Sequence, residues 1–226
     1  MTRLIEKQEI INLRKGFYLI IPPRYSKLGK VPIQLYINKL FKSLGREYYL
    51  GFYSAAKFHG ASHQQPQQDY VMIAKPKLGD IKKENLSIRF FTSSIWSNEN
   101  IQEKKSDAGF FKISSPALTA VDLIHHQSKL GGMNRMLAVL EELSEEISKE
   151  DIEKLLTWYP YKSSLQRLGF ILEELDVEPS IIDPIGEHLA KAKFFPVLLS
   201  PKHNEKAGSV DNRWKVDVNI NMESDL

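Results

Sequence analysis

The stretch Gly109-Phe-Phe-Lys-Ile-Ser-Ser-Pro-Ala-Leu-Thr-Ala-Val-Asp-Leu-Ile124 determines the fold class, because it predicts a strand and a helix with almost no linker between them. Residues 109–113 are a short run of β-forming side chains. Ser115 and Pro116 are a favoured N-cap and first residue of the helix that follows. The apolar residues of that helix recur at a spacing that places them on one side: Leu118, Val121 and Ile124.

Strands and helices alternate irregularly ahead of this stretch. Residues 70–74 and 86–91 are short apolar runs bounded by Pro, Gly, Asp or Ser, so both are predicted to be strands. Helical spacing predicts one helix over residues 32–45 and a shorter one over 54–60, which Ser54 would cap. This irregular order favours an α+β fold over a doubly wound sheet.

The last third of the chain is predicted to be helical before it returns to strand. Residues 194–199 are expected to form a strand and residues 201–212 a loop. Apolar and polar side chains alternate over residues 214–220, which predicts a half-buried strand. Three helices are expected from their apolar spacing, around residues 133–143, 148–160 and 164–175.

The N-terminal segment combines a short helix with a basic hairpin. Residues 4–10 have loose helical spacing, and Lys15-Gly16 precedes a β-forming run that Pro22-Pro23 ends. A short helix followed by such a hairpin is typical of the end of a winged helix, in which Arg14 and Lys15 would lie along DNA phosphates. The alternative is an edge hairpin whose cations keep it from aggregating. We therefore expect residues 1–28 to be a partial winged-helix segment and residues 29–226 a mixed α/β body.

Charge is distributed unevenly along the 226 residues, although the net charge is only +3. Residues 1–48 carry ten basic and three acidic side chains, whereas residues 141–187 carry four and thirteen. The basic end indicates a polyanionic partner, unless the two segments are merely exposed faces of opposite sign. There is no cysteine, which excludes disulfides and thiolate zinc sites. No apolar run is long enough to span a membrane, so we expect a cytoplasmic protein with no membrane partner.

No segment of the sequence predicts a catalytic residue, a metal site or a cofactor. His59 and His63 are four residues apart, but Gly60 is expected to end the helix between them. The nearest approach to a nuclease centre is Asp211, Lys215 and Asp217. Lys215 and Asp217 alternate with apolar residues on the expected strand, on a face that is expected to be solvated. A divergent metal-dependent nuclease using Asp217 is accordingly a minor alternative.

Basic residues beyond the hairpin extend the expected surface for phosphates. Arg24 follows the hairpin closely enough to join Arg14 and Lys15. Further cations would add to this footprint only if they lay next to the hairpin: Lys30, Lys39, Lys42 and Arg46.

Five segments in this order carry a resemblance to one protein family. The most specific is Tyr49-Leu-Gly-Phe-Tyr-Ser-Ala-Ala-Lys-Phe-His-Gly-Ala-Ser-His-Gln-Gln-Pro66. The others are the hairpin segment 13–22, the Ser-Pro-x-x-Thr-x-x-Asp helix at 113–124, and segments 165–174 and 213–219. Together they resemble the AbiEi-type antitoxins of type IV (abortive-infection) toxin–antitoxin systems, over residues from about 10 to 220.

The resemblance implies a non-enzymatic antitoxin that also represses its own promoter through an N-terminal winged helix. Its functional partner would be a nucleotidyltransferase-like toxin, neutralised without a stable complex. The helix before the hairpin would place Arg3 and Lys7 in the DNA groove. Members of the family carry two further helices ahead of the segment that begins here at Met1, so a truncated winged helix is expected. The alternative function is a protein- or RNA-binding domain that has lost promoter binding.

Overall fold

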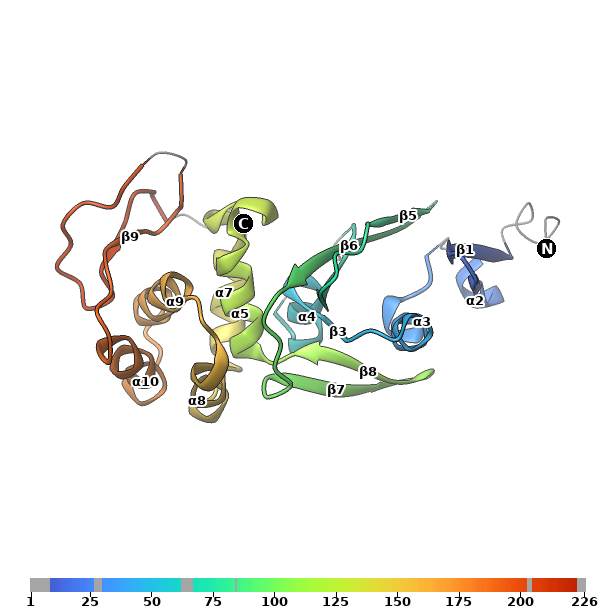
Figure 1. Ribbon diagram of the computed structural model, residues 1–226, viewed down its shortest axis with the longest axis horizontal. Coiled ribbons are helices and arrows are strands. Elements are labelled where there is room, and N and C mark those ends of the chain that lie inside the picture. The colour runs from blue at the N-terminus through green and yellow to red at the C-terminus, as the bar shows by residue number, and fades with distance from the viewer. Residues whose placement is uncertain (1–8, 27–29, 62–66, 84, 203–204, 223–226) are drawn as a thin grey trace. The chain divides into compact units, whose positions relative to one another are not determined.

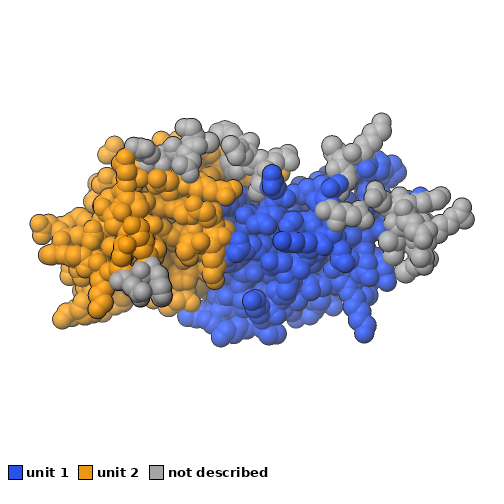
Figure 2. Space-filling view, turned by 90° about the horizontal axis from the view of Figure 1, so that it is seen from above, with its two compact units in different colours: residues 1–54, 66–96, 101–113 blue, residues 55–65, 97–100, 114–226 orange. Residues whose placement is uncertain are grey.

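The computed structural model describes residues 9–26, 30–61, 67–83, 85–202 and 205–222. These residues form two compact units (Figure 2). Unit 1 comprises Met1–Ser54, Pro66–Trp96 and Ile101–Ile113, and unit 2 comprises Ala55–Gln65, Ser97–Asn100 and Ser114–Leu226. The expected boundary at residue 28 stays a prediction.

The predicted N-terminal hairpin is confirmed. Strands β1 (Ile10–Arg14) and β2 (Phe17–Ile20) pair antiparallel. The turn falls at Lys15-Gly16, where Gly16 has a φ of 82°, a conformation that glycine adopts without strain. The short helix α2 (Pro23–Ser26) follows (Figure 1). The helix expected over residues 4–10 lies mostly outside the described residues, but Ile10 belongs to β1 rather than to a helix.

A six-stranded mixed sheet forms the body of unit 1 and confirms the α+β class. Its strand order is β5-β6-β4-β3-β8-β7. Strand β3 is antiparallel to β4 and parallel to β8, while β4 and β6 are parallel. The strands predicted at 70–74, 86–91 and 109–113 are β4, β6 and β8. The bounds are β3 (Tyr48–Leu50), β4 (Asp69–Ala74), β5 (Ile81–Lys83), β6 (Leu86–Ser93), β7 (Ile101–Ser106) and β8 (Gly109–Ser114).

Two helical segments that flank β3 in the sequence differ in detail from the prediction. The expected helix over 32–45 is divided at Tyr36 into a 3₁₀ turn, η1 (Ile33–Leu35), and α3 (Ile37–Leu44). Helix α4 (Phe52–Ala56) and the 3₁₀ turn η2 (Lys57–His59) follow β3. The predicted Ser54 cap is wrong, because α4 begins two residues earlier. The Ser54 hydroxyl instead accepts a hydrogen bond from the backbone N–H of Tyr70 at 2.8 Å.

Unit 2 is built around α5 (Pro116–His125), whose residues 116–124 are all buried. It packs against three other helices of the unit, α7, α8 and α9. The predicted cap is confirmed at Ser115, which accepts from the N–H of Leu118. The helix predicted from residue 148 is capped in the same way by Ser148, which accepts from the N–H of Asp151. Helix α10 was not predicted. The further bounds are α6 (Gln127–Leu130), α7 (Met133–Ser144), α8 (Lys149–Trp158), α9 (Lys162–Glu174) and α10 (Pro179–Ala190).

The half-buried strand predicted over 214–220 is found only in part. Only β10 (Val216–Asp217) is a strand, paired in parallel with β9 (Val197–Leu198). Lys215 has a φ of 51°, which interrupts an extended chain. Trp214 and Val216 are buried as the alternation predicts, but Val218 is 47% exposed, so the pattern does not continue beyond Asp217. Among the described residues, no helix combines the length and apolar character needed to cross a membrane.

Candidate nucleic-acid interface

Within unit 1, the N-terminal hairpin is fastened to the loop before β5 by Arg14, one of the residues predicted to contact DNA. Arg14 donates a hydrogen bond through Nη2 to the carbonyl oxygen of Gly79, in the loop that precedes β5. Its guanidinium carbon also lies 5.7 Å from the centre of the Phe90 ring. Burial lowers the pKa of Arg14, and the nearby Arg46 lowers it further while Asp80 opposes the shift. Arg14 therefore positions the hairpin by an internal contact, whereas Lys15 at its turn is exposed.

The loop between β4 and β5 is held from a second direction by Arg46. This side chain donates through Nη2 to the carbonyl oxygens of Ala74 and Pro76. Asp80, at the end of the loop, accepts a hydrogen bond from the backbone N–H of Phe90 at 2.9 Å. The loop backbone is thus fixed by two guanidinium groups and one carboxylate.

Four exposed lysines that the prediction missed lie on this loop and on β5, which follows it. With Lys15 they form what we call the lysine edge, and among the described residues no ion pair involves any of its members. A simple count of charges over residues 75–83, four lysines against one aspartate, could have found it. Such a concentration of unpaired cations attracts phosphates. The lysine edge comprises Lys15, Lys75, Lys77, Lys82 and Lys83.

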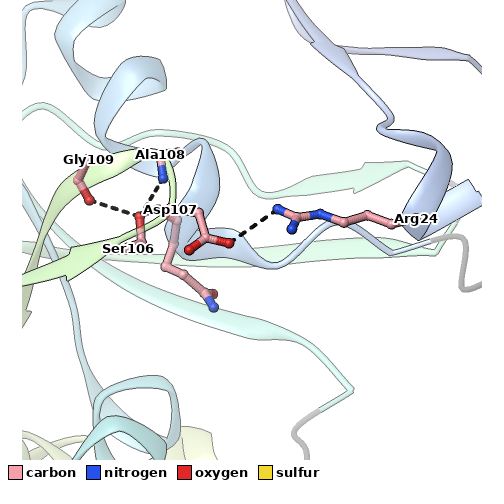
Figure 3. A network of polar contacts seen from close by, with 6 residues as sticks. Arg24, Ser106, Asp107, Ala108 and Gly109 are labelled. Atoms are coloured by element: carbon pink, nitrogen blue, oxygen red, sulfur yellow. Dashed lines mark hydrogen bonds and ion pairs between the residues drawn. The ribbon is translucent and has the colours of Figure 1, made fainter.

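Arg24 does not join Arg14 and Lys15 as expected. It pairs with Asp107 at 3.4 Å and stacks on Tyr25 at 4.7 Å (Figure 3). Asp107 lies in the turn after β7, whereas Arg14 contacts the loop before β5. Because β5 and β7 are the two edges of the sheet, the two arginines lie at opposite edges.

The other predicted cations divide into occupied and free side chains. Lys30 forms an ion pair with Asp69 at 3.6 Å, and Arg46 is held by the two carbonyls described above. Lys39 and Lys42 project from α3, are exposed, and pair with no carboxylate among the described residues. Arg3 and Lys7 lie outside the described residues.

Alpha-helix α3 and the β7–β8 hairpin border an open groove of about 660 Å³ in unit 1. Lys39 and Lys42 line it from the helix, and Phe110 lines it from β8. The floor is made by Phe41 and Tyr48, which are buried and stacked with their ring centres 4.6 Å apart. The groove therefore combines an aromatic base with free cations.

The residues nearest to a nuclease centre are otherwise engaged in unit 2. Asp217 accepts through Oδ2 from the backbone N–H of Gly208 at 2.8 Å. Lys215 donates to the carbonyl oxygen of Phe194 at 3.3 Å and lies over its ring. His59 contacts the carbonyl oxygen of Ser114 through Nε2, and His63 lies outside the described residues. In the part of the chain that the structure describes, no three histidine or acidic side chains could hold a metal ion.

The family of the AbiEi antitoxin C-terminal domain matches residues 49–174, from β3 to the end of α9. The chain belongs to this family, which confirms the resemblance and supports an antitoxin role in a toxin–antitoxin system.

The fold is similar to one that has been solved by crystallography. The crystal structure of the RV2827C protein from Mycobacterium tuberculosis matches with a TM-score of 0.63 and 18% sequence identity. The match covers 95% of this chain and 78% of that one. At this identity the likeness concerns the fold alone. A comparison with curated proteins gives no match.

Proposed function

We propose that this protein is the antitoxin of a type IV toxin–antitoxin pair and that it represses its own operon in the cytoplasm by binding promoter DNA. The observation that supports DNA binding is the lysine edge, whose five exposed cations lie on the hairpin turn, the loop before β5 and β5 itself. Arg14 and Arg46 hold this loop in place. Prepositioned cations bind phosphates at a lower cost in conformational entropy than cations on a loose loop. The toxin is a nucleotidyltransferase-like enzyme, neutralised without a stable complex, and the antitoxin itself catalyses no reaction.

In this proposal the hairpin places Lys15 beside the other lysines, and the lysines supply the affinity for DNA phosphates. Arg14 aligns β1 with the loop before β5, so that Lys15 and the β5 lysines Lys82 and Lys83 share one rigid base. Contacts to phosphates alone carry no sequence information. Specificity for the promoter therefore falls to the segment that precedes β1, where Arg3 and Lys7 are the candidate groove contacts.

Fluorescence anisotropy with a duplex from the upstream region of the gene, against a scrambled duplex, tests the DNA part. Each lysine that meets a phosphate contributes about 0.9 to the slope of log K against log salt. The triple variant Lys15→Ala/Lys82→Ala/Lys83→Ala is expected to weaken binding and to reduce this slope by about 2 to 3. The matched control replaces three exposed lysines of unit 2: Lys191, Lys193 and Lys206.

The control triple variant should retain the slope of the natural protein. Equal loss in both triple variants would refute a role for the lysine edge, because only net charge would then matter. Weak binding that is equal for the two duplexes would refute promoter recognition and favour the protein- or RNA-binding alternative.

Co-expression with the adjacent toxin gene tests the antitoxin part. Growth should be restored by the natural chain, and the toxin should not co-purify with it. Failure to restore growth at matched toxin levels would contradict the antitoxin role, and a stable complex would contradict type IV action.

A further inference from the structure

The groove between α3 and the β7–β8 hairpin has a wall whose position is set by polar contacts. The hydroxyl of Ser106 lies 2.8 Å from the carbonyl oxygen of Gly109 and 3.2 Å from that of Gln34, and it accepts from the N–H of Ala108 (Figure 3). The Arg24–Asp107 ion pair adds a further link at the same turn. The hairpin thus stands at a fixed distance from η1 and α3.

Phe110 is the unusual side chain of this wall. It is 55% exposed, although its neighbours Phe111 and Ile113 on β8 are buried on the other face of the strand. No ring contact involves Phe110 among the described residues, whereas Phe41 and Tyr48 in the floor stack on each other. An exposed aromatic ring beside a groove is a surface on which a flat group can stack.

The charge of the groove is suited to phosphates on the side of α3. Lys39 and Lys42 are exposed and unpaired among the described residues. Of the two carboxylates in the lining, Glu47 is neutralised by Lys112 at 2.7 Å, which leaves Glu103 on β7. An anionic strand would therefore run along the helix side, with its aromatic groups turned toward β8.

We propose that this groove binds a single strand of nucleic acid, with one base stacked on Phe110 and backbone phosphates at Lys39 and Lys42. A groove of about 660 Å³ holds one or two nucleotides, while a duplex cannot unstack a base onto Phe110 without opening. An acidic peptide would match the lysines but would leave the aromatic wall unused. The strand can be DNA or RNA, since both supply the same bases and phosphates.

This activity is separate from promoter binding, because it shares no residue with the lysine edge. Lys39 and Lys42 would then bind phosphates even if they do not lie next to the N-terminal hairpin.

Anisotropy with labelled oligo(dT) and oligo(U) of about 12 nucleotides tests the proposal and distinguishes DNA from RNA. Phe110→Ala is expected to weaken binding about tenfold, and Phe110→Trp to restore or exceed it. Lys39→Ala/Lys42→Ala should reduce the salt slope by about 0.7 per lysine. The controls are Phe195→Ala, which removes another exposed ring, and Lys191→Ala/Lys206→Ala.

Circular dichroism melting confirms that each variant is folded. Binding of either oligonucleotide that is lost in Phe110→Ala and kept in Phe195→Ala supports the proposal. Absence of binding to both oligonucleotides, or equal binding by Phe110→Ala and the natural protein, overturns it. Tighter binding of a poly-glutamate peptide than of either oligonucleotide overturns it in favour of an acidic peptide. Promoter duplex binding measured alongside is independent, because only the lysine-edge variant should change it.

Discussion

Replacing Gly169 by alanine is expected to force the Trp214 indole out of its packed position in unit 2. A Cβ at residue 169 would lie 2.6 Å from Cη2 of Trp214 and closer still to two other ring carbons. Ordinary contacts between carbons are about 3.5 to 4 Å, so the ring must move by about 1 Å or leave. The ring is fully buried, and its Nε1–H donates to Glu173 at 2.7 Å, so it has little freedom to move.

The size of the effect follows from two opposing contributions. Overpacking of a filled core costs about 1 to 3 kcal/mol, and more if the indole is expelled. Alanine in place of glycine within a helix returns about 1 kcal/mol. Because three ring carbons would lie within 2.6 Å of the added Cβ, the upper part of that range applies, about 2 to 3 kcal/mol. The free energy of unfolding should therefore fall by about 1 to 2 kcal/mol in Gly169→Ala.

Gly186 of α10 provides a matched control against the same indole. A Cβ at residue 186 would lie 3.8 Å from Cη2 of Trp214, which is an ordinary contact. Gly186→Ala should therefore gain about 0.5 to 1 kcal/mol from helix propensity alone. The two substitutions are chemically identical but their effects on the free energy of unfolding should differ by about 1.5 to 3 kcal/mol, with opposite signs.

Urea unfolding followed by circular dichroism measures both variants, and tryptophan emission reports on the indole. Emission should shift to longer wavelength in Gly169→Ala and stay unchanged in Gly186→Ala. The double variant Gly169→Ala/Trp214→Leu should recover part of the loss, which is a coupling that a double-mutant cycle measures. Equal stability of the two alanine variants would refute the reasoning, since the close approach of α9 to Trp214 would then have no energetic consequence.

Two further predictions concern polar groups of unit 2. Asp151→Ala should lower the free energy of unfolding by about 1 to 3 kcal/mol in chemical denaturation, because its carboxylate accepts from the N–H of Ala117 at 2.7 Å and from Nδ2 of Asn100 at 2.8 Å. The N–H of Ala117 would lose this acceptor, whereas Asn100 would keep its bond to the backbone carbonyl oxygen of residue 151 at 2.9 Å. No change in stability would contradict that role. Burial lowers the pKa of His125, and the charges of Arg167 and Lys129 lower it further. The unfolded chain then binds the proton more readily, so stability should fall as the pH drops below about 6.5. In His125→Asn the free energy of unfolding should depend less steeply on pH below about 6.5, by at most about 1.4 kcal/mol per pH unit. An equal dependence on pH in the variant and the natural protein would contradict the role of His125.

The sequence predicted correctly those helices whose first residue is set by interactions between neighbouring residues. Ser115-Pro116 and Ser148 cap their own helices, so the sequence around each cap contains the whole reason for the helix start. Strand β7 was missed because Ile101–Ser106 is mostly polar and becomes a strand only through its place beside β8. The alternation at 214–220 predicted the burial of Trp214 and Val216 correctly but overestimated the length of the strand. Trp214 lies outside the strand and is buried against Gly169 of α9, a long-range contact that periodicity does not indicate.

The sequence predicted that the candidate interface contains a basic hairpin, but not which groups its side chains contact. A basic hairpin was expected and found, but Arg14 bonds to a carbonyl 65 residues away. A sequence does not state which acceptor a guanidinium will reach. Lys82 and Lys83 were overlooked because they lie on a short edge strand that the prediction did not contain.

The segments of the two units alternate along the chain, which limits how the gene can exchange parts with other genes. The chain passes between unit 1 and unit 2 five times, and each unit collects three separate segments. A single recombination event within the gene cannot transfer either unit intact to another protein. Either unit could be transferred only as several separate pieces of the gene, so we expect the two units to be inherited together.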